Sequence, residues 1–515
     1  MKMVVVLISF YCLVTPAYCL CAAVPDFDSA AAQGSGSVIH ATASAAKTPL
    51  IYCTDLFYPP EDPDDHYDLA MLAFMQAFDL RAFIFDFSAS RREPEDIGVS
   101  ALKQISEITG DKIPPYAVGL RNPLLYRQDK GYGQPEKSQA AIELIIKALR
   151  ESKEKVTVFS VGSCRDLAAA FNREPELFKS KISALYINAG NGPGGLQFEW
   201  NVMLDPYAYM IIMESGLPIY WCPCFSEVNL RVSSAADVNA GKAFNTYFVV
   251  PDQSAIFRNS SNKVKNYISY ALSNSNQDPI EYLKRDNPVI PSTPRNMWCT
   301  GPFLHAAGWN IYKSGEDYIA CSERQAVDMG IKNSRIDVFS FDNIVLEQTD
   351  KEYTKPANPL CYYLGCMFDR VGLFSLERDG RPDCHVRLTG LRNGASVSRV
   401  VIVGPENVVY DYPQSAGNRA LAIKNNGDNM DCLFSPGKDG EYLISVYYNN
   451  AGQNNNKQED GGQVDKYSCG INIYPVGPVF KGELSSKDSS VKVFRYVNTE
   501  YNSIMVSVLS GIMDK

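Results

Sequence analysis

A short acidic segment between two apolar runs carries the side chains best suited to chemistry. Five aspartates and one glutamate fall within residues 55–68: Asp55, Glu61, Asp62, Asp64, Asp65 and Asp68. One or two carboxylates at the start of a helix are stabilised by the helix dipole, but a larger group repels itself unless something neutralises it. Ca²⁺ takes roughly six to eight oxygen ligands, many of them from carboxylates. The segment predicts a site for a cation or for sugar hydroxyls, with a solvated acidic loop as the alternative.

A second polar cluster follows a later apolar run. Five side chains within a Gly-rich stretch could contact a ligand: Asn188, Asn191, Glu199, Asn201 and Asp205. Asn and Glu side chains at the end of a strand can hydrogen-bond the hydroxyl groups of a sugar. Asn, Gly and Asp also favour turns. Taken alone, this cluster therefore predicts either a binding loop or an ordinary turn.

The elements that must position these clusters can be inferred from the apolar pattern. Between residues 48 and 335, continuous apolar runs such as 82–85, 156–161 and 184–187 predict buried strands. Amphipathic segments between them predict helices; residues 138–152 place four aliphatic side chains on one helical face. This alternation predicts an α/β domain with a mainly parallel sheet flanked by helices. In such a sheet ligands bind at the carboxyl ends of the strands, where the acidic segment falls.

Other segments have different expected roles. Residues 1–23 contain Lys2, an apolar run and small residues, which predicts a secretory signal peptide and an exported protein, periplasmic, secreted or at the cell surface. Residues 24–47 are small and polar, as in a flexible linker. Residues 380–515 contain short alternating runs bounded by Gly, Asn and Pro, which predict an all-β sandwich domain joined by a connecting segment, 336–379.

The composition of the 515-residue chain limits its partners. A net charge of −9 leaves no basic face for nucleic acid. Beyond the first residues, no run is long and apolar enough to span a bilayer. Of 14 cysteines, eleven follow the expected signal peptide, and their spacing does not match a zinc site. We expect a small-molecule ligand and one or two disulfides, and the sequence leaves homo-oligomerisation open.

Three motifs in fixed order resemble the inosine–uridine nucleoside hydrolase family. In the first, Asp55 matches the aspartate before the family's turn, and Asp64-Asp65 match the closing pair, although this loop is about five residues longer. The second motif is VGSCRDLA at 161–168, which is followed by EPEL. The third is EWNVMLDPYA at 199–208, which is followed by SGLP. The resemblance covers about residues 48–335, and the third motif is the most specific.

The resemblance implies a reaction and a set of roles. Family members hydrolyse the N-glycosidic bond of a ribonucleoside, with Ca²⁺ holding a water and the ribose diol, and carboxylates stabilise the oxocarbenium-like state. By carry-over, Asp55 would be the general base and a metal ligand. Asp65 would hold the metal, and Asp64 would contact the ribose diol. The backbone carbonyl of Arg165 would also reach the metal.

The third motif and its surroundings would supply the remaining sugar contacts. By the same carry-over, Asn191, Glu199 and Asn201 would hold the ribose, the last two near its 5′ hydroxyl. Substrate-binding residues would therefore come from two strand ends far apart in the sequence.

The chain departs from the family pattern at two places. Where the family has a Gly-Asn pair after its second strand, this chain has Asp86 in the run 85–87. Where the family has His-Asp-Pro, this chain has Thr300, Gly301 and a proline, so one expected calcium ligand is not found. His305 could substitute only if its loop is rebuilt. The surrounding carboxylates would favour a protonated His66, which could act as the acid or be a solvated loop residue.

These observations leave three functions open. The favoured one is a hydrolase of ribonucleosides or related N-ribosides. The main alternative is a catalytically weak or inactive homologue that binds a sugar or nucleoside. The third is an adhesion or surface module in which the β domain is the functional part.

Overall fold

The structure is a computed structural model, and it describes most of the chain after residue 46. The described residues are 47–58, 60, 63–86, 98–124, 127–193, 200–225, 235–273, 275–348, 359–364, 371–378, 381–388, 397–403, 408–413, 415–426, 429–434, 440–448, 465–475 and 480–514. The expected signal peptide and nearly all of the expected linker lie outside these residues.

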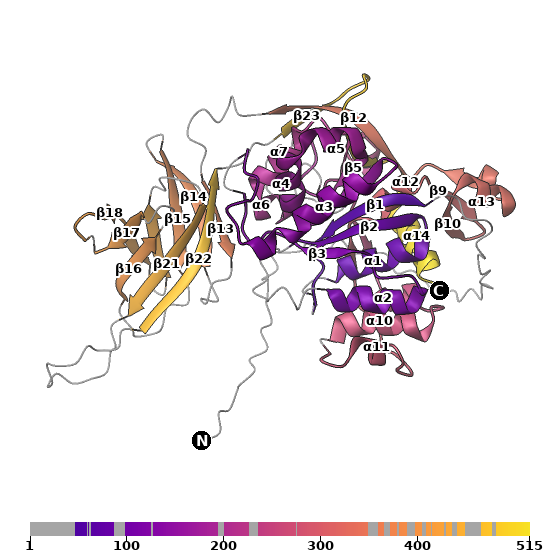
Figure 1. The fold of residues 1–515 in the computed structure, drawn as a ribbon, viewed down its shortest axis with the longest axis horizontal. Helices are drawn as coiled ribbons and strands as arrows, with labels where there is room; N and C mark the ends of the chain where they lie inside the picture. Colours follow the sequence, from indigo (N-terminus) through magenta and orange to yellow (C-terminus); the bar gives the residue numbers. More distant parts are fainter. Residues whose placement is uncertain are drawn as a thin grey trace. The chain divides into compact units, whose positions relative to one another are not determined.

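A nine-stranded sheet forms the centre of the large domain (Figure 1). Its strands lie in the order β23-β12-β24-β6-β5-β4-β1-β2-β3. The strands are β1 Thr48–Thr54, β2 Phe78–Phe85, β3 Tyr116–Val118, β4 Val156–Ser160, β5 Ile182–Ile187, β6 Ile219–Trp221, β12 Phe339–Gln348, β23 Phe480–Leu484 and β24 Val491–Tyr496. All neighbouring pairs from β24 to β3 are parallel, whereas β12 is antiparallel to both β24 and β23. The predicted mainly parallel sheet is confirmed.

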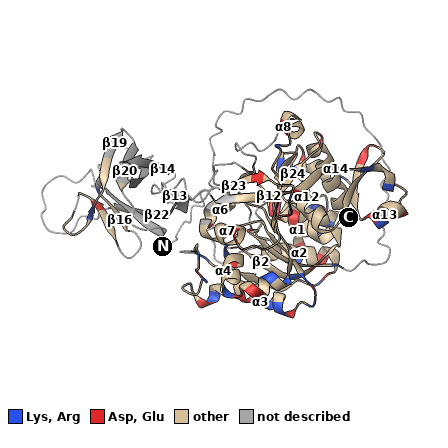
Figure 2. Cartoon of the chain, turned by 90° about the horizontal axis from the view of Figure 1, so that it is seen from above, with Lys and Arg blue, Asp and Glu red and all other residues tan. Residues whose placement is uncertain are grey.

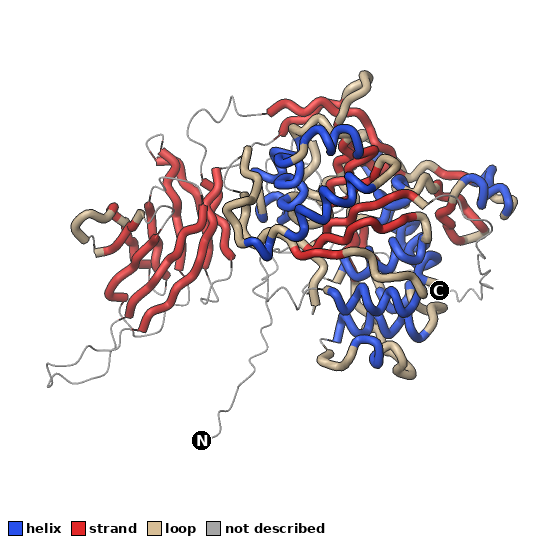
Figure 3. Tube along the Cα trace, viewed as in Figure 1, coloured by secondary structure: helices blue, strands red, loops and turns tan. Residues whose placement is uncertain are grey.

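Helices cover both faces of this sheet because its central strands are apolar on both sides. In β1, Leu50 and Tyr52 pack into one core, and Ile51 and Cys53 pack into the other. The first core is covered by α1 Asp64–Met75, α2 Val99–Thr109, α10 Asn262–Ser273, α12 Thr300–Ala306 and α14 Tyr501–Met513. The second core is covered by α3 Ala140–Glu151, α4 Arg165–Arg173, α5 Pro175–Lys181 and α7 Pro206–Met213. Figure 3 shows the resulting layers of helix, sheet and helix.

Shorter elements complete the large domain. They are the helices α6 Trp200–Leu204, α8 Ala235–Asn239, α9 Gln253–Ile256, α11 Pro279–Tyr282 and α13 Glu323–Asp328, and the 3-10 turns Glu136–Ser138 and Lys332–Ser334. Two small antiparallel sheets are formed by β7 Phe248–Val250 with β8 Arg295–Met297, and by β9 Asn310–Ser314 with β10 Asp317–Cys321 and β11 Arg335–Ile336.

The C-terminal residues return to the large domain. β24 lies between β6 and β12, and the side chains of α14 are buried in the first core. The hydroxyl of Tyr501 donates to the carbonyl of Thr246 at 2.8 Å. The sequence analysis placed residues 380–515 in a second domain, whereas in the structure 480–514 belong to the large sheet and its core. An alternating strand pattern identifies a half-buried strand but not the sheet that it joins.

The strand-rich part lies between β12 and β23 in the sequence. One antiparallel sheet contains β13 Pro359–Leu364, β22 Asp465–Pro475, β21 Gly440–Tyr448, β16 Val397–Val403 and β17 Val409–Tyr412, with β18 Arg419–Ala420 added in parallel. The other contains β14 Val371–Arg378, β15 Arg381–Leu388, β20 Asn429–Phe434 and β19 Ala422–Asn426. The ring of Tyr410 in one sheet lies 5.0 Å from that of Phe434 in the other. The predicted second, all-β part is confirmed, although its first strand begins at Pro359 rather than near residue 380.

Two other expectations concern the described residues directly. No helix in the described part of the chain is long and apolar enough to cross a membrane. Seven described cysteines are buried and form no disulfide: Cys53, Cys164, Cys222, Cys224, Cys299, Cys321 and Cys432. The predicted disulfides could therefore involve only cysteines other than these seven.

Candidate functional site

The two ends of the acidic segment meet at the carboxyl end of β1. Asp55 follows β1 directly and is partly buried, and Asp64 and Asp65 open helix α1. The hydroxyl of Thr54, the last residue of β1, donates to Oδ1 of Asp65 at 2.6 Å. The same hydroxyl oxygen accepts from the backbone N–H of Leu56 at 3.1 Å. The structure therefore joins the strand end to the start of the helix, as a site at the strand end requires.

The carboxylates of this segment act on one another. Burial raises the pKa of Asp65 well above its usual value, and the negative charges of Asp55, Asp64 and Asp68 raise it further. Asp65 and Asp68 are both buried, with exposed fractions of 9% and 1%. Such a group is stable only if some carboxyls are protonated or if a cation lies among them.

The predicted sugar-binding asparagines lie at the ends of the next two strands. In α6, the side-chain NH₂ of Asn201 donates to the carbonyl of Val161 after β4 at 3.0 Å and to that of Asn188 after β5 at 2.9 Å. Asn191 is buried and forms an isolated bridge with Phe225. These contacts place both asparagines at the predicted edge of the sheet. Their predicted contacts with ribose remain predictions, and Glu199 lies outside the described residues.

Arg165, at the start of α4, is held by a buried network. Its Nε donates to Oδ2 of Asp205 at 3.2 Å, and its Nη1 and Nη2 donate to the carbonyls of Leu120 and Leu204 at 3.0 and 2.8 Å. Its Nη1 also lies 4.0 Å from Oδ1 of Asp86. Burial raises the pKa of Asp205 to about 6, although Arg165 lowers it. The network fixes the start of α4, where the Arg165 carbonyl is expected to reach the metal.

Asp86, at the end of β2, is a site residue to which the sequence analysis assigned no role. Its Oδ2 accepts from the backbone N–H of Ser163 at 2.6 Å, and its side chain is buried. A Cβ on Gly162 would lie 2.8 Å from Asp86 Oδ2 and 3.1 Å from the backbone nitrogen of Asp55. Asp86 and Asp55 therefore both lie against the position of a Gly162 side chain, where the ends of β1, β2 and β4 meet. The sequence showed only that the family's Gly-Asn pair is absent around Asp86. That difference did not predict the contacts of Asp86 with Ser163 and Arg165.

The prediction of a protonated His66 is wrong. The His66 ring is buried in α1, and neither ring nitrogen has a hydrogen-bond partner among the described residues. Burial lowers the pKa of His66 to about 3. Its ring lies 6.1 Å from that of Tyr267, on the apolar side of α1. Burial, and not the carboxylates beside it in the sequence, sets the protonation of His66.

His305 lies in an aromatic cluster. Its Nδ1 is 2.7 Å from the hydroxyl of Tyr186, and its ring lies 4.9 and 4.5 Å from those of Tyr220 and Phe341. Burial, and to a lesser degree the charge of Lys492, lower the pKa of His305 to about 4. These contacts explain the position of His305 structurally, without any role as a replacement acid.

Gly301 explains why the family's carboxylate has no counterpart here. A Cβ at this position would lie 3.0 Å from the ring of Phe494 in β24. The C-terminal strand therefore packs where a side chain of residue 301 would begin. The neighbouring Thr300 is fully buried, and its hydroxyl has no hydrogen-bond partner among the described residues.

The acidic segment has the carboxylate donors that a hard cation requires, but its described side chains are not gathered around one point. In the part of the chain that the structure describes, no three His, Cys, Asp or Glu side chains are gathered tightly enough to hold a metal ion. Yet Asp65 is buried within the field of three other carboxylates, and Ca²⁺ binds such oxygen donors together with carbonyls. A cation would draw these side chains of like charge together, so the donor set of the acidic segment fits Ca²⁺.

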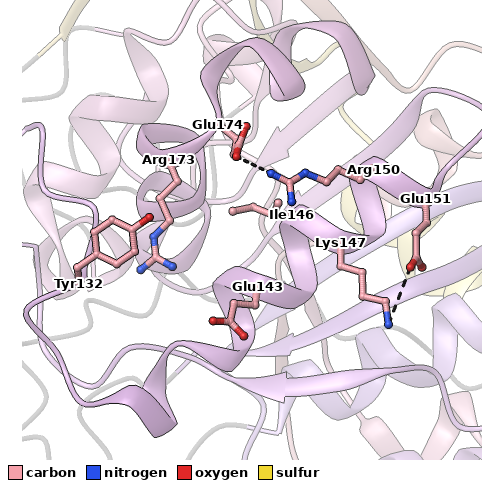
Figure 4. A pocket seen from close by; sticks show the side chains of 8 residues that line it. All are labelled: Tyr132, Glu143, Ile146, Lys147, Arg150, Glu151, Arg173 and Glu174. Atoms are coloured by element: carbon pink, nitrogen blue, oxygen red, sulfur yellow. Dashed lines mark hydrogen bonds and ion pairs between the residues drawn. The ribbon is translucent and has the colours of Figure 1, made fainter.

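A surface pocket lies elsewhere, over α3 and the end of α4 (Figure 4). It has a volume of about 390 Å³ and is lined by charges of both signs. Arg150 pairs with Glu174 at 2.5 Å, and the guanidinium of Arg173 lies 4.0 Å over the ring of Tyr132. Figure 2 shows acidic and basic residues intermixed around α3. No predicted site residue lines this pocket, and its charges balance one another.

Fold and site together define an α/β protein with a carboxylate-rich site at the carboxyl ends of parallel strands. Residues 62–279 match the family model of inosine-uridine preferring nucleoside hydrolases. The resemblance predicted from the three motifs is therefore confirmed.

Individual relatives support the same resemblance. A pyrimidine-specific ribonucleoside hydrolase, RihA, of Enterobacter sp. (strain 638) is 32% identical over 177 residues, which cover 31% of this chain and 56% of that relative. RihA of Escherichia coli O1:K1 / APEC is 30% identical with the same coverage. The chain thus spans about half the length of these curated relatives. The structure of an inosine-uridine preferring nucleoside hydrolase from Bacillus anthracis is 17% identical to this chain. The match covers 49% of this chain and 90% of that chain, with a TM-score of 0.30.

Proposed function

We propose that this chain hydrolyses the N-glycosidic bond of a ribonucleoside or a related N-riboside. One observation carries the proposal: the hydroxyl of Thr54, at the end of β1, holds the buried Asp65 of α1 at 2.6 Å, near the charges of Asp55, Asp64 and Asp68. Residues 62–279 of the chain match the nucleoside hydrolase family model. Buried carboxylates at a strand end suit a reaction in which positive charge develops on the sugar ring. We also propose, from the pattern of residues 1–23, that the protein is exported.

The chain's own residues divide the work as follows. Asp55 accepts the proton of the attacking water, whose oxygen bonds to C1′ of the ribose. The C1′–N bond breaks, and its electron pair leaves with the base. The ribose ring is oriented by hydrogen bonds between its hydroxyls and four side chains. The carboxylates accept these bonds and the amides accept or donate them: Asp64, Asn191, Glu199 and Asn201. The carboxylates of Asp55 and Asp65 lie on the side of the developing oxocarbenium charge.

Calcium is the cofactor that these residues would hold. Asp55, Asp65 and the carbonyl of Arg165 would bind it, and when bound it would acidify the attacking water and hold the ribose diol. At neutral pH neither His66 nor His305 carries the proton that a departing base could take. The reaction is therefore expected to favour leaving groups that depart without a histidine acid.

Ribose release by the purified chain tests the proposal. Inosine, adenosine, uridine and cytidine are assayed with Ca²⁺ and then with chelator, and p-nitrophenyl riboside is included because its leaving group needs no acid. We expect turnover that chelator removes and that Asp55→Ala abolishes. Asp79→Asn, which changes an exposed carboxylate paired with Arg81, is the matched control and should keep full activity. A folded chain that releases ribose from none of these substrates would contradict the proposal.

A binding protein without turnover is the second candidate. It is favoured by Gly301, where the family's aspartate is replaced and Phe494 lies 3.0 Å from the position of a Cβ. Fewer carboxylate ligands weaken Ca²⁺ binding. Titration of the chain with inosine and uridine by calorimetry separates the candidates: saturable binding without ribose release supports this one, and turnover excludes it.

A further inference from the structure

The acidic segment reaches the site in two arms, and both arms contact the same helix, α10, or the residues directly after it. The first arm, 55–58, leaves the end of β1, and the second begins with Asp64 at the start of α1. Helix α10 lies beside both, although its residues follow about two hundred positions later in the sequence. The contacts on the two arms come from two tyrosine hydroxyls.

On the first arm, Tyr58 closes the end of α10. Its hydroxyl donates to the carbonyl of Ser275 at 2.6 Å and approaches that of Tyr270 at 3.4 Å. The rings of Tyr58 and Tyr270 stack, with centroids 4.4 Å apart and planes at 12°. Ser275 lies just beyond the last residue of α10, so the short hydrogen bond ties Tyr58 to the segment that follows the helix, and the stacked ring ties it to the helix itself. The arm is thereby fixed three residues after Asp55.

On the second arm, α10 supplies the hydroxyl. Tyr267, which is fully buried, donates to the backbone carbonyl of His66 at 2.8 Å. His66 follows Asp65 directly, so this bond fixes the first turn of α1 close to the buried carboxylate. A buried hydroxyl and a buried carbonyl that pair in this way are costly to separate.

We propose that Tyr58 and Tyr267 are positioning residues that hold Asp55 and Asp65 in register across the site. Tyr58 fixes the arm that carries the general base, and Tyr267 fixes the arm that carries the buried carboxylate. The loop between these arms is about five residues longer than the family's, which makes the attachment of both arms to α10 and the segment that follows it more important. The expected effect of the two tyrosines on calcium binding and turnover rests on the proposed function. Their expected effect on the mobility of the backbone does not.

Phenylalanine variants test this proposal because they keep the rings and remove only the hydroxyls. Tyr58→Phe, Tyr267→Phe and the double variant are compared with Tyr282→Phe. Tyr282 packs edge-on against Tyr270 at 5.1 Å, and its hydroxyl contacts Ser269 and Ser273 rather than the acidic segment. Tyr282 ends α11, so this variant controls for the loss of a tyrosine hydroxyl that contacts α10 but not the acidic segment.

Two readouts are measured on the full mature chain: amide hydrogen exchange and the calcium dissociation constant by calorimetry. For Tyr58→Phe we expect at least threefold faster exchange in peptides covering 55–58, and for Tyr267→Phe the same in peptides covering 64–68. Each variant should raise the calcium Kd at least threefold and lower kcat more than it changes KM. Tyr282→Phe should match the wild type in both readouts.

The outcomes separate this proposal from the proposed function. If Tyr58→Phe and Tyr267→Phe melt earlier but match Tyr282→Phe in exchange and in calcium Kd, their role is only structural and the proposal is overturned. If the wild type neither binds Ca²⁺ nor releases ribose, the proposed function fails. In that case the exchange rates alone decide: faster exchange in both arms supports positioning by the two tyrosines, and unchanged exchange overturns it.

Discussion

Gly162 shows how closely single residues are fitted around the candidate base. It follows β4, and its missing side chain leaves room for both the Asp86 carboxylate and the backbone of Asp55. Asp86 in turn accepts the N–H of Ser163 and lies near Arg165. The Asp86 carboxylate therefore contributes to the packing of the site as well as to its charge.

Gly162→Ala should disturb the site more than the fold. Its methyl group would lie 2.8 Å from Asp86 Oδ2, so that carboxylate or the backbone of Asp55 must move. We expect a loss of about 1–3 kcal/mol in the free energy of unfolding, as for other overpacked sites, together with loss of ribose release. Gly133→Ala, where a Cβ meets nothing within 4 Å, is the control. Equal activity in the two variants would show that Asp86 and Asp55 are not packed against Gly162.

His66 should make the protein sensitive to acid. Its pKa is lowered by burial to about 3 in the folded state, against its ordinary value of 6.5. As the pH falls, His66 is protonated in the unfolded chain before it is protonated in the folded chain. The contribution of neutral His66 to stability is therefore fully present above pH 6.5 and is lost as the pH falls toward 3. At pH 5 the loss is about 2 kcal/mol, because one pKa unit corresponds to about 1.36 kcal/mol.

Urea denaturation at pH 8 and pH 5 checks the expected acid sensitivity. His66→Leu keeps an apolar side chain and cannot be protonated, so its stability should fall less than that of the wild type between the two pH values. An identical fall in both proteins would place the His66 ring in contact with solvent. A merely destabilised variant would lose stability equally at both pH values, which makes the comparison specific.

At the scale of elements, Asp205 connects three parts of the chain. Its Oδ1 caps α7 by accepting the N–H of Ala208 at 2.9 Å, and its Oδ2 accepts from the N–H of Leu124 at 2.8 Å and from Arg165. The carboxylate is fully buried. It therefore acts as a helix cap, a loop anchor and the partner of a buried cation at once.

Asp205→Ala is expected to cost much more than the loss of an ordinary helix cap. Removing it leaves the Arg165 guanidinium buried without its carboxylate, which costs about 3–5 kcal/mol. Asp252 caps α9 by accepting the N–H of Ser254 at 2.9 Å and is not buried in this way, so Asp252→Ala should cost about 1 kcal/mol. Chemical denaturation of both variants measures the difference. Similar costs would mean that the Arg165 network contributes little to stability.

The elements also show what the sequence could and could not predict. The buried strands β1, β4 and β5 were predictable because a continuous apolar run has few other uses, and the three motifs placed Asp55, Asp65 and Arg165 at strand ends. The burial of His66 was not predictable from its acidic neighbours, because the side of α1 that a residue faces depends on what α10 packs against it. The Asp86–Arg165–Asp205 network was missed because its members are far apart in the sequence.

At the scale of the whole molecule, the strand-rich part is inserted into an antiparallel pair of strands. β12 ends at Gln348 and β23 begins at Phe480, and these two residues are direct partners in the ladder. The described strands of the strand-rich part, β13 to β22, thus fall in the sequence between two strands that pair at the edge of the large sheet (Figure 1). β24 and α14 then complete the sheet and the first core. The large domain is thus continuous in space but interrupted in sequence.

Replacement of residues 349–479 by Asn-Gly should leave a folded large domain. A two-residue turn of this type joins directly paired antiparallel strands, and Gln348 and Phe480 already occupy that geometry. The shortened chain is expected to unfold cooperatively near the wild-type temperature and to keep the calcium affinity and ribose release of the full chain.

The comparison chain ends at residue 479 instead, and it loses β24 between β6 and β12 together with the buried side chains of α14. That truncation should be insoluble or unfolded by circular dichroism. If the truncated chain folds and the shortened one does not, the large domain is completed by the strand-rich part and not by β24 and α14.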